Sequence, residues 1–228
     1  MRFLIIIAFF FGSLTVEANA QFGGLKNPLD AAKSLTGGGE QGEQGEESGS
    51  AADSQDALVK RYVAAISGLL DAQYNFALAF DLKDEAAKIQ DAKNLINNDT
   101  SKNGLKTATN VSSETDKLIM SKTGEQTALS AEGKIYYAKA LPDYARGAYN
   151  MGKLAPDASK WLKNAQAEVK GAGIAGGMNI KKKLDVGLFI APKIPGLLKT
   201  FASNTNKLVS YGKKNDLDTS GADEANFD

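Results

Sequence analysis

The sequence contains no cysteine and no histidine among its 228 residues. These absences exclude disulfide bonds, a cysteine nucleophile, a Ser-His-Asp triad, and zinc or haem sites built on Cys or His. An excess of one charge is also absent, because 27 Lys and Arg balance 27 Asp and Glu. A neutral chain lacks the basic surplus of dedicated nucleic-acid-binding proteins, so we expect no nucleic-acid partner. With 43% hydrophobic and 24% charged residues, the composition is that of a globular protein.

The first 20 residues have the pattern of a secretory signal peptide. Arg2 supplies the positive charge, residues 3–11 form a nearly unbroken apolar run, and Ala18-Asn19-Ala20 is an A-x-A cleavage site. The apolar run is well short of the roughly 20 residues that a transmembrane helix needs. We therefore predict cleavage before Gln21 and export to a bacterial periplasm, with secretion from the cell as the alternative.

Both ends of the chain that follows are acidic and poor in apolar residues. Gly37-Gly38-Gly39 leads into Glu-Gln-Gly repeats, and residues 215–228 contain five acids and no base. Such segments bury too little surface to offset the entropy that ordering costs. We predict a disordered, low-complexity acidic tether over residues 21–52 and a disordered acidic tail over residues 213–228.

Residues 53–212 carry apolar side chains at steps of three and four residues, which indicates amphipathic helices. No segment alternates strictly enough to predict a strand with conviction, although residues 184–191 fit either a helix or a strand. The expected fold is all-α, an irregular bundle of about five to seven helices. We expect a kink at Pro142, a helix boundary at Pro156, and the end of the last helix at Gly212.

Two motifs match the residue spacing of known ligand sites but lack the surrounding sequence that those sites require. Residues 171–176 read Gly-Ala-Gly-Ile-Ala-Gly, the spacing of a dinucleotide fingerprint, but a predicted helix precedes them where that fingerprint needs a strand. Residues 216–221 resemble the first half of an EF-hand calcium loop, but position twelve is Phe227 and not the bidentate Glu. We interpret the first motif as a joint between helices and predict neither a cofactor nor a metal site.

Paired carboxylates are the enzymatic chemistry that remains open to this composition. A glycan hydrolase needs an acid with a raised pKa beside a second carboxylate or a bound water. Glu132, near Tyr136, Tyr137 and Tyr144 in sequence, is the best candidate for an acid in an aromatic groove. A charged residue in the first turn of a helix is usually solvated, however, so we assign no catalytic residue.

The segment from residue 170 to residue 214 is the basic part of the chain, with nine bases and one acid. Three consecutive lysines precede an apolar stretch, an arrangement that can rest on an anionic membrane with its apolar side among the headgroups. The simpler interpretation is a bundle helix with a basic outer face. The candidate membrane or partner surface comprises Lys181, Lys182, Lys183, Leu188, Phe189 and Ile190.

These patterns together predict an exported bacterial envelope protein that acts as a non-enzymatic interaction, scaffold or binding module, with a protein partner in the envelope. One alternative is a helical protein that associates with a membrane surface through its basic C-terminal segment. The other is a carboxylate-dependent hydrolase of cell-wall glycans.

Overall fold

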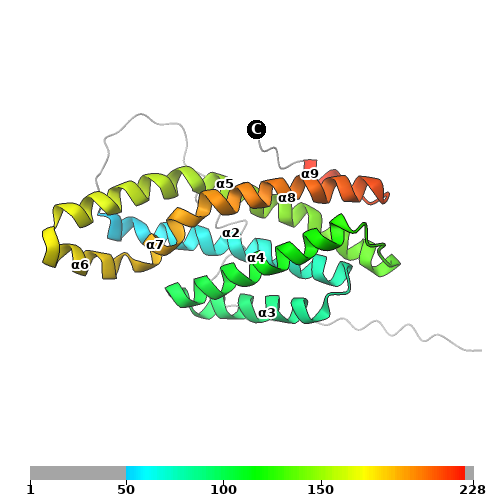
Figure 1. The fold of residues 1–228 in the computed structure, drawn as a ribbon, viewed down its shortest axis with the longest axis horizontal. Helices are drawn as coiled ribbons and strands as arrows, with labels where there is room; N and C mark the ends of the chain where they lie inside the picture. Colours follow the sequence, from blue (N-terminus) through cyan, green and yellow to red (C-terminus); the bar gives the residue numbers. More distant parts are fainter. Residues whose placement is uncertain (1–49, 224–228) are drawn as a thin grey trace, which may run out of the picture. The chain divides into compact units, whose positions relative to one another are not determined.

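The computed structural model describes residues 50–223, and this part of the chain is all-α, with no strand (Figure 1). The predicted all-α irregular bundle is confirmed. The predicted signal peptide and the predicted tether up to residue 49 lie outside the described residues. None of the described helices is long and apolar enough to cross a membrane. In chain order the elements are α2 (Ala51–Ala79), α3 (Lys83–Asn98), α4 (Lys102–Gly124), α5 (Ala131–Gly171), α6 (Gly173–Lys183), α7 (Asp185–Ile190), the 3-10 helix η1 (Ala191–Lys193), α8 (Ile194–Lys214) and α9 (Ser220–Asp223).

Helix α2 begins two residues before the predicted boundary at Asp53. The Ser50 side chain accepts a hydrogen bond from the Asp53 amide, and the Asp53 carboxylate accepts one from the Ser50 amide. This capping box pairs two amides that the first helical turn would otherwise leave free. Ala51 is already buried in the core. Residues 50–52 therefore belong to the folded domain, and the predicted tether is too long at this end.

Helix α5 runs unbroken through both of its prolines, so the predicted boundary at Pro156 is wrong. Each proline removes one backbone hydrogen bond from a helix interior, which favours a break. Leu154 and Ala158, on either side of Pro156, are buried in the core. Packing of the flanking turns therefore holds the helix together where local preference alone predicts an end.

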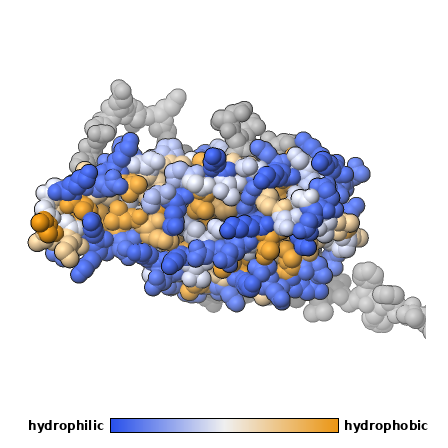
Figure 2. Space-filling view, viewed as in Figure 1, coloured by the Kyte–Doolittle hydropathy of each residue, from blue (hydrophilic) through white to orange (hydrophobic). Residues whose placement is uncertain are grey.

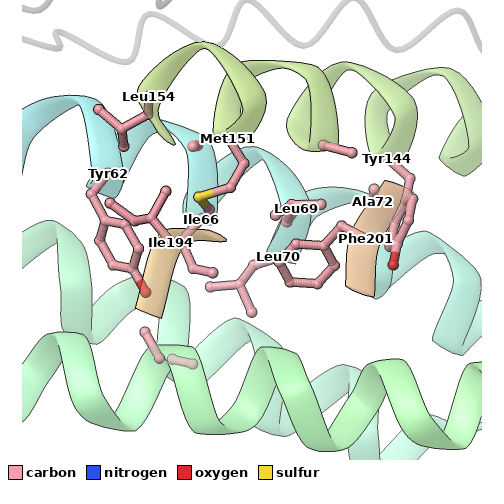
Figure 3. Packing of buried hydrophobic residues seen from close by; sticks show 14 of the residues in the cluster. Tyr62, Ile66, Leu69, Leu70, Ala72, Tyr144, Met151, Leu154, Ile194 and Phe201 are labelled. Atoms are coloured by element: carbon pink, nitrogen blue, oxygen red, sulfur yellow. The ribbon is translucent and has the colours of Figure 1, made fainter. Parts of the chain in front are cut away.

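The core takes side chains from α2, α3, α4, α5, α7 and α8, and Figure 3 shows the part where α2, α5 and α8 meet. Side chains on one face of α2 point toward buried residues of the other two helices, as expected for apolar stripes of period 3.6. Phe76 of α2 also stacks edge-on against Tyr137 and Tyr144 of α5, with ring centroids 5.0 and 5.8 Å apart. The residues labelled in Figure 3 are Tyr62, Ile66, Leu69, Leu70, Ala72, Tyr144, Met151, Leu154, Ile194 and Phe201.

Helices α2 and α5 approach closely at Gly147. A Cβ atom added at Gly147 would lie 2.8 Å from Leu69 Cγ and 3.3 Å from the Leu69 backbone nitrogen. Gly68, in the interior of α2, has no atom within 4 Å of the same position. The two glycines therefore form a matched pair with opposite expected behaviour.

We expect Gly147→Ala to destabilise the protein by about 1–3 kcal/mol, because a methyl group forces apart a packed interface. Gly68→Ala should instead stabilise it by up to about 1 kcal/mol, because alanine is the better helix former and meets nothing here. Urea unfolding followed by circular dichroism measures both. Equal effects of the two substitutions would contradict the close approach of α2 and α5.

The C-terminal segment is ordered through residue 223, which corrects the predicted disordered tail over residues 213–223. Helix α8 continues through Gly212 to Lys214, and the chain then folds back so that a Cβ at Gly212 would meet Thr219 at 2.6 Å. Gly221 of α9 lies against Pro142, and Ala222 is buried. A few small and apolar side chains anchor this segment despite its acidic composition. Residues 224–228 lie outside the described part.

Residues 185–190 form α7 and Ala191 begins η1, so the strand alternative for residues 184–191 is wrong. Leu184, Gly187 and Ile190 recur at steps of three and are buried, which places one face of α7 against the bundle. The preceding glycine-rich motif is the predicted joint between helices, because α5 ends at Gly171 and α6 begins at Gly173. Gly173 has φ +67°, a conformation that favours glycine.

Candidate functional site

Helix α6 lies at one end of the bundle (Figure 1), where hydrophobic residues are exposed (Figure 2). Ile174 is 91% exposed and Met178 is 60% exposed. Spacings of four, seven and eight residues place Lys181 and Lys182 on the same face of the helix as Ile174. We call Ile174, Met178, Lys181 and Lys182 the α6 stripe.

The face of α6 next to the stripe holds the helix against the bundle. Gly177 and Leu184 are buried and Ile180 packs against the core. A Cβ at Gly177 would lie 2.7 Å from the Val169 carbonyl oxygen, so the absence of a side chain lets α6 pack directly on the end of α5. The α6 stripe is thus carried on an anchored helix.

Within residues 50–222, no acid forms an ion pair with Lys181, Lys182 or Lys183. Residues 169–184 contain four lysines and no acid. The two flanking acids are engaged elsewhere: Asp185 pairs with Lys102 at 2.7 Å, and Glu168 accepts a hydrogen bond from the Ala51 amide. Lysines in the last turn also interact favourably with the helix dipole, which explains their position but not the exposed Ile174 and Met178.

The sequence-predicted surface is only partly assembled by the structure. Lys181, Lys182 and Lys183 are exposed at the end of α6 as expected. Ile190 is fully buried, so it is removed from the candidate surface. Leu188 and Phe189 are half-buried and pack against the core. The Lys193 ammonium lies 4.9 Å from the centre of the Phe189 ring, so that ring already has a cationic neighbour.

The aromatic groove that the glycan-hydrolase hypothesis needs is not formed around Glu132. Glu132 is exposed in the first turn of α5, where its charge and hydrogen bond raise the pKa of Tyr136. Tyr137 is buried and its hydroxyl donates to the Leu208 carbonyl at 2.6 Å. Tyr144 is buried and donates to Asp116. Two of the three tyrosines therefore face the core and not a substrate.

The EF-hand-like segment forms a turn stabilised within itself. The Asp218 carboxylate accepts hydrogen bonds from the Ser220 amide at 3.0 Å and the Ser220 hydroxyl at 2.7 Å. These bonds lower the pKa of Asp218. Within residues 50–222, no three acids converge in a way that could hold a metal ion. Phe227 lies outside the described residues.

A second candidate site is a buried carboxylate at the junction of α2, α4, α5 and α8. Asp116 of α4 is 2% exposed. Its two oxygens accept hydrogen bonds from the Tyr144 hydroxyl of α5 and the Asn204 amide of α8. The Gln73 side chain of α2 also stabilises the charged form of this carboxylate by hydrogen bonding. One acidic side chain thus ties together the polar groups of four helices.

Burial raises the pKa of Asp116, and the hydrogen bonds from Tyr144, Asn204 and Gln73 offset part of that effect. Lys207 also lowers it through its charge, but no described cation forms an ion pair with Asp116. Burial likewise raises the pKa of Tyr144 well above its usual range. A buried carboxylate with only neutral hydrogen-bond partners is a costly arrangement and a marker of functional sites.

Asp116 lies at a groove between α4 and α8 with a volume of about 460 Å³. Three apolar side chains, Met120, Leu197 and Phe201, form much of its wall. Buried hydroxyl and amide oxygens remain without a partner in the same region of α2 and α4, namely Gln73 Oε1, Ser112 Oγ and Thr115 Oγ1. The complete lining is Ser113, Asp116, Lys117, Met120, Leu197, Thr200, Phe201 and Asn204.

Sequence reasoning missed this groove, although one signal was present. In α4 the inward positions after Leu105 and Ala108 are Ser112, Thr115 and Asp116, before Ile119 restores the apolar pattern. Polar residues at core positions of an amphipathic helix indicate a buried polar cluster. The partner Asn204 sits in the same way on the buried face of α8.

Comparison of the chain with protein-family models, with curated proteins and with solved structures gives no match.

Proposed function

We propose that this is an exported, non-enzymatic interaction module that attaches to an anionic membrane surface of the bacterial envelope through the α6 stripe. The observation that carries the proposal is the exposure of Ile174 and Met178 on the same helix face as Lys181 and Lys182. The signal-peptide pattern of residues 1–20 supports export.

The chemistry of the stripe suits the boundary between headgroups and acyl chains. Apolar side chains enter the interface while lysines contact the lipid phosphates. Each lysine near an anionic surface contributes about 1 kcal/mol, so the two stripe lysines and the adjacent Lys183 together supply up to ~3 kcal/mol before screening. That free energy corresponds to roughly a hundredfold in affinity, which is too little for stable attachment by itself. Insertion of Ile174 and Met178 must therefore add to the binding free energy.

The test is co-sedimentation of the mature protein with phosphatidylcholine vesicles that contain roughly one-third phosphatidylglycerol. At this anionic fraction the membrane surface attracts lysines strongly. Replacing Lys181, Lys182 and Lys183 with Gln should weaken binding about a hundredfold at low salt and little at high salt, because salt screens the lysines. Ile174→Ser combined with Met178→Ser should weaken binding about tenfold or more at both salt concentrations.

Two matched controls test whether binding depends on where the lysines and apolar residues lie or only on how many the protein has. Gln substitutions at Lys106, Lys134 and Lys139 remove the same charge from exposed positions elsewhere, and Ile135→Ser removes an exposed isoleucine from α5. Both controls should bind like the wild type. If the wild-type protein ignores anionic vesicles at low salt, the membrane proposal fails, and a protein partner in the envelope becomes the better hypothesis for the stripe.

A further inference from the structure

We propose that the groove between α4 and α8 is a binding site for small organic cations, with an ammonium group on the Asp116 carboxylate and a short apolar chain along Met120, Leu197 and Phe201. This site is separate from the α6 stripe, and its occupancy does not depend on membrane attachment. The lining of the groove places one carboxylate, that of Asp116, beside an apolar wall.

The charge of Asp116 is the first argument for a cation. Its oxygens accept one hydrogen bond each from neutral donors, Tyr144 and Asn204. Each carboxylate oxygen has two lone pairs, so these two donors and Gln73 together leave acceptor capacity for one more hydrogen bond. Among the described residues no Lys or Arg pairs with Asp116. A bound ammonium supplies the counter-charge that a buried carboxylate otherwise lacks.

The shape and lining of the groove define the rest of the ligand. A volume of about 460 Å³ is within the usual range of small-molecule sites. The apolar side chains Met120, Leu197 and Phe201 favour an alkyl or aromatic body next to the charged group. Lys117 also lines the groove and Lys207 acts on Asp116 through its charge, but neither lysine forms an ion pair with the Asp116 carboxylate.

A structural interpretation of Asp116 is a hydrogen-bonded tie between helices with no ligand. That interpretation explains the bonds to Tyr144 and Asn204, but it does not require an open groove beside the carboxylate. The two interpretations differ in whether a cation binds more tightly than a neutral molecule of the same size.

The experiment is a titration of the ¹⁵N-labelled mature protein at neutral pH with hexylammonium chloride, hexanol and sodium hexanoate, followed by amide chemical shifts. We expect saturable shifts at the groove residues, with hexylammonium binding at least tenfold more tightly than hexanol and hexanoate binding more weakly than either. Asp116→Asn should reduce hexylammonium affinity at least tenfold, to that of hexanol. Thr200→Trp, at an exposed lining position, should weaken both hexylammonium and hexanol.

Three results would overturn the proposal. The first is the absence of saturable shifts at the groove with hexylammonium, and the second is equal affinity for hexylammonium and hexanol. The third is wild-type hexylammonium affinity in either variant. Because Thr200→Trp leaves the carboxylate and its bonds in place, the proposal stays falsifiable even if Asp116→Asn fails to fold.

Discussion

Replacing Trp161 with alanine is expected to lower the free energy of unfolding by about 3–5 kcal/mol, since it deletes a large buried ring. Trp161 of α5 is 5% exposed, and its Nε1 donates a hydrogen bond to the Ala51 carbonyl at 2.9 Å. Its ring also lies against Gly187, where any side chain would collide with it. One residue therefore joins α5 to the start of α2 and to α7.

Urea unfolding followed by circular dichroism measures the effect of Trp161→Ala. Trp161→Phe is the matched control, because it keeps an aromatic ring and loses the hydrogen bond, for a smaller cost of about 1–2 kcal/mol. Hydrogen exchange should also speed up in residues 185–190 of the alanine variant. A loss below ~1 kcal/mol for alanine would show that Trp161 does not join these three helices.

The second large effect is expected at Asp116, where alanine and asparagine should behave differently. Asp116→Ala leaves the Tyr144 hydroxyl and the Asn204 amide buried without a partner, and each orphaned group costs about 1–3 kcal/mol. Asp116→Asn keeps an oxygen for Tyr144 and removes a buried charge. We therefore expect the asparagine variant to be more stable than the alanine variant by at least ~2 kcal/mol in urea unfolding at pH 7.

The pH dependence of the free energy of unfolding provides the control for the two Asp116 variants. Burial raises the pKa of Asp116 above its ordinary value of 3.8, so the folded state holds this proton to higher pH than the unfolded state does. Protonation of Asp116 thus favours folding, and the free energy of unfolding contributed by this group falls as pH rises from 3.8 through the raised pKa. Asp116→Asn should remove that fall. The same slope in wild type and variant would contradict a raised pKa at Asp116.

Periodicity predicted the all-α fold because each main helix buries one apolar stripe. Local signals failed where packing outweighed them. Pro156 indicates a helix boundary, yet buried Leu154 and Ala158 carry α5 through it. The acidic composition after Lys214 indicates disorder, yet Gly221 against Pro142 and buried Ala222 anchor the chain there. Contacts between residues far apart in sequence decide both cases, and composition does not contain them.

The sequence predicted the lysines of the α6 site but not the apolar residues of the α6 stripe. Lys181, Lys182 and Lys183 are visible as a run in the sequence, and they are exposed. Ile174 and Met178 fall in a glycine-rich stretch that local preference assigns to a joint, so their place on a helix face depends on how Gly177 packs against Val169. The apolar residues next in sequence, Leu188 to Ile190, turn inward because α7 needs a buried face.

Attachment through α6 is tested most directly with an environment-sensitive fluorophore on the stripe itself. Since the chain has no cysteine, Met178→Cys provides one attachment point for a nitrobenzoxadiazole label, and Ile135→Cys provides an exposed control on α5. With phosphatidylglycerol-containing vesicles at low salt, we predict a blue shift and brighter emission at position 178 and no change at position 135. An unchanged spectrum at position 178 in protein that sediments with the vesicles, or equal shifts at both positions, would contradict attachment through α6.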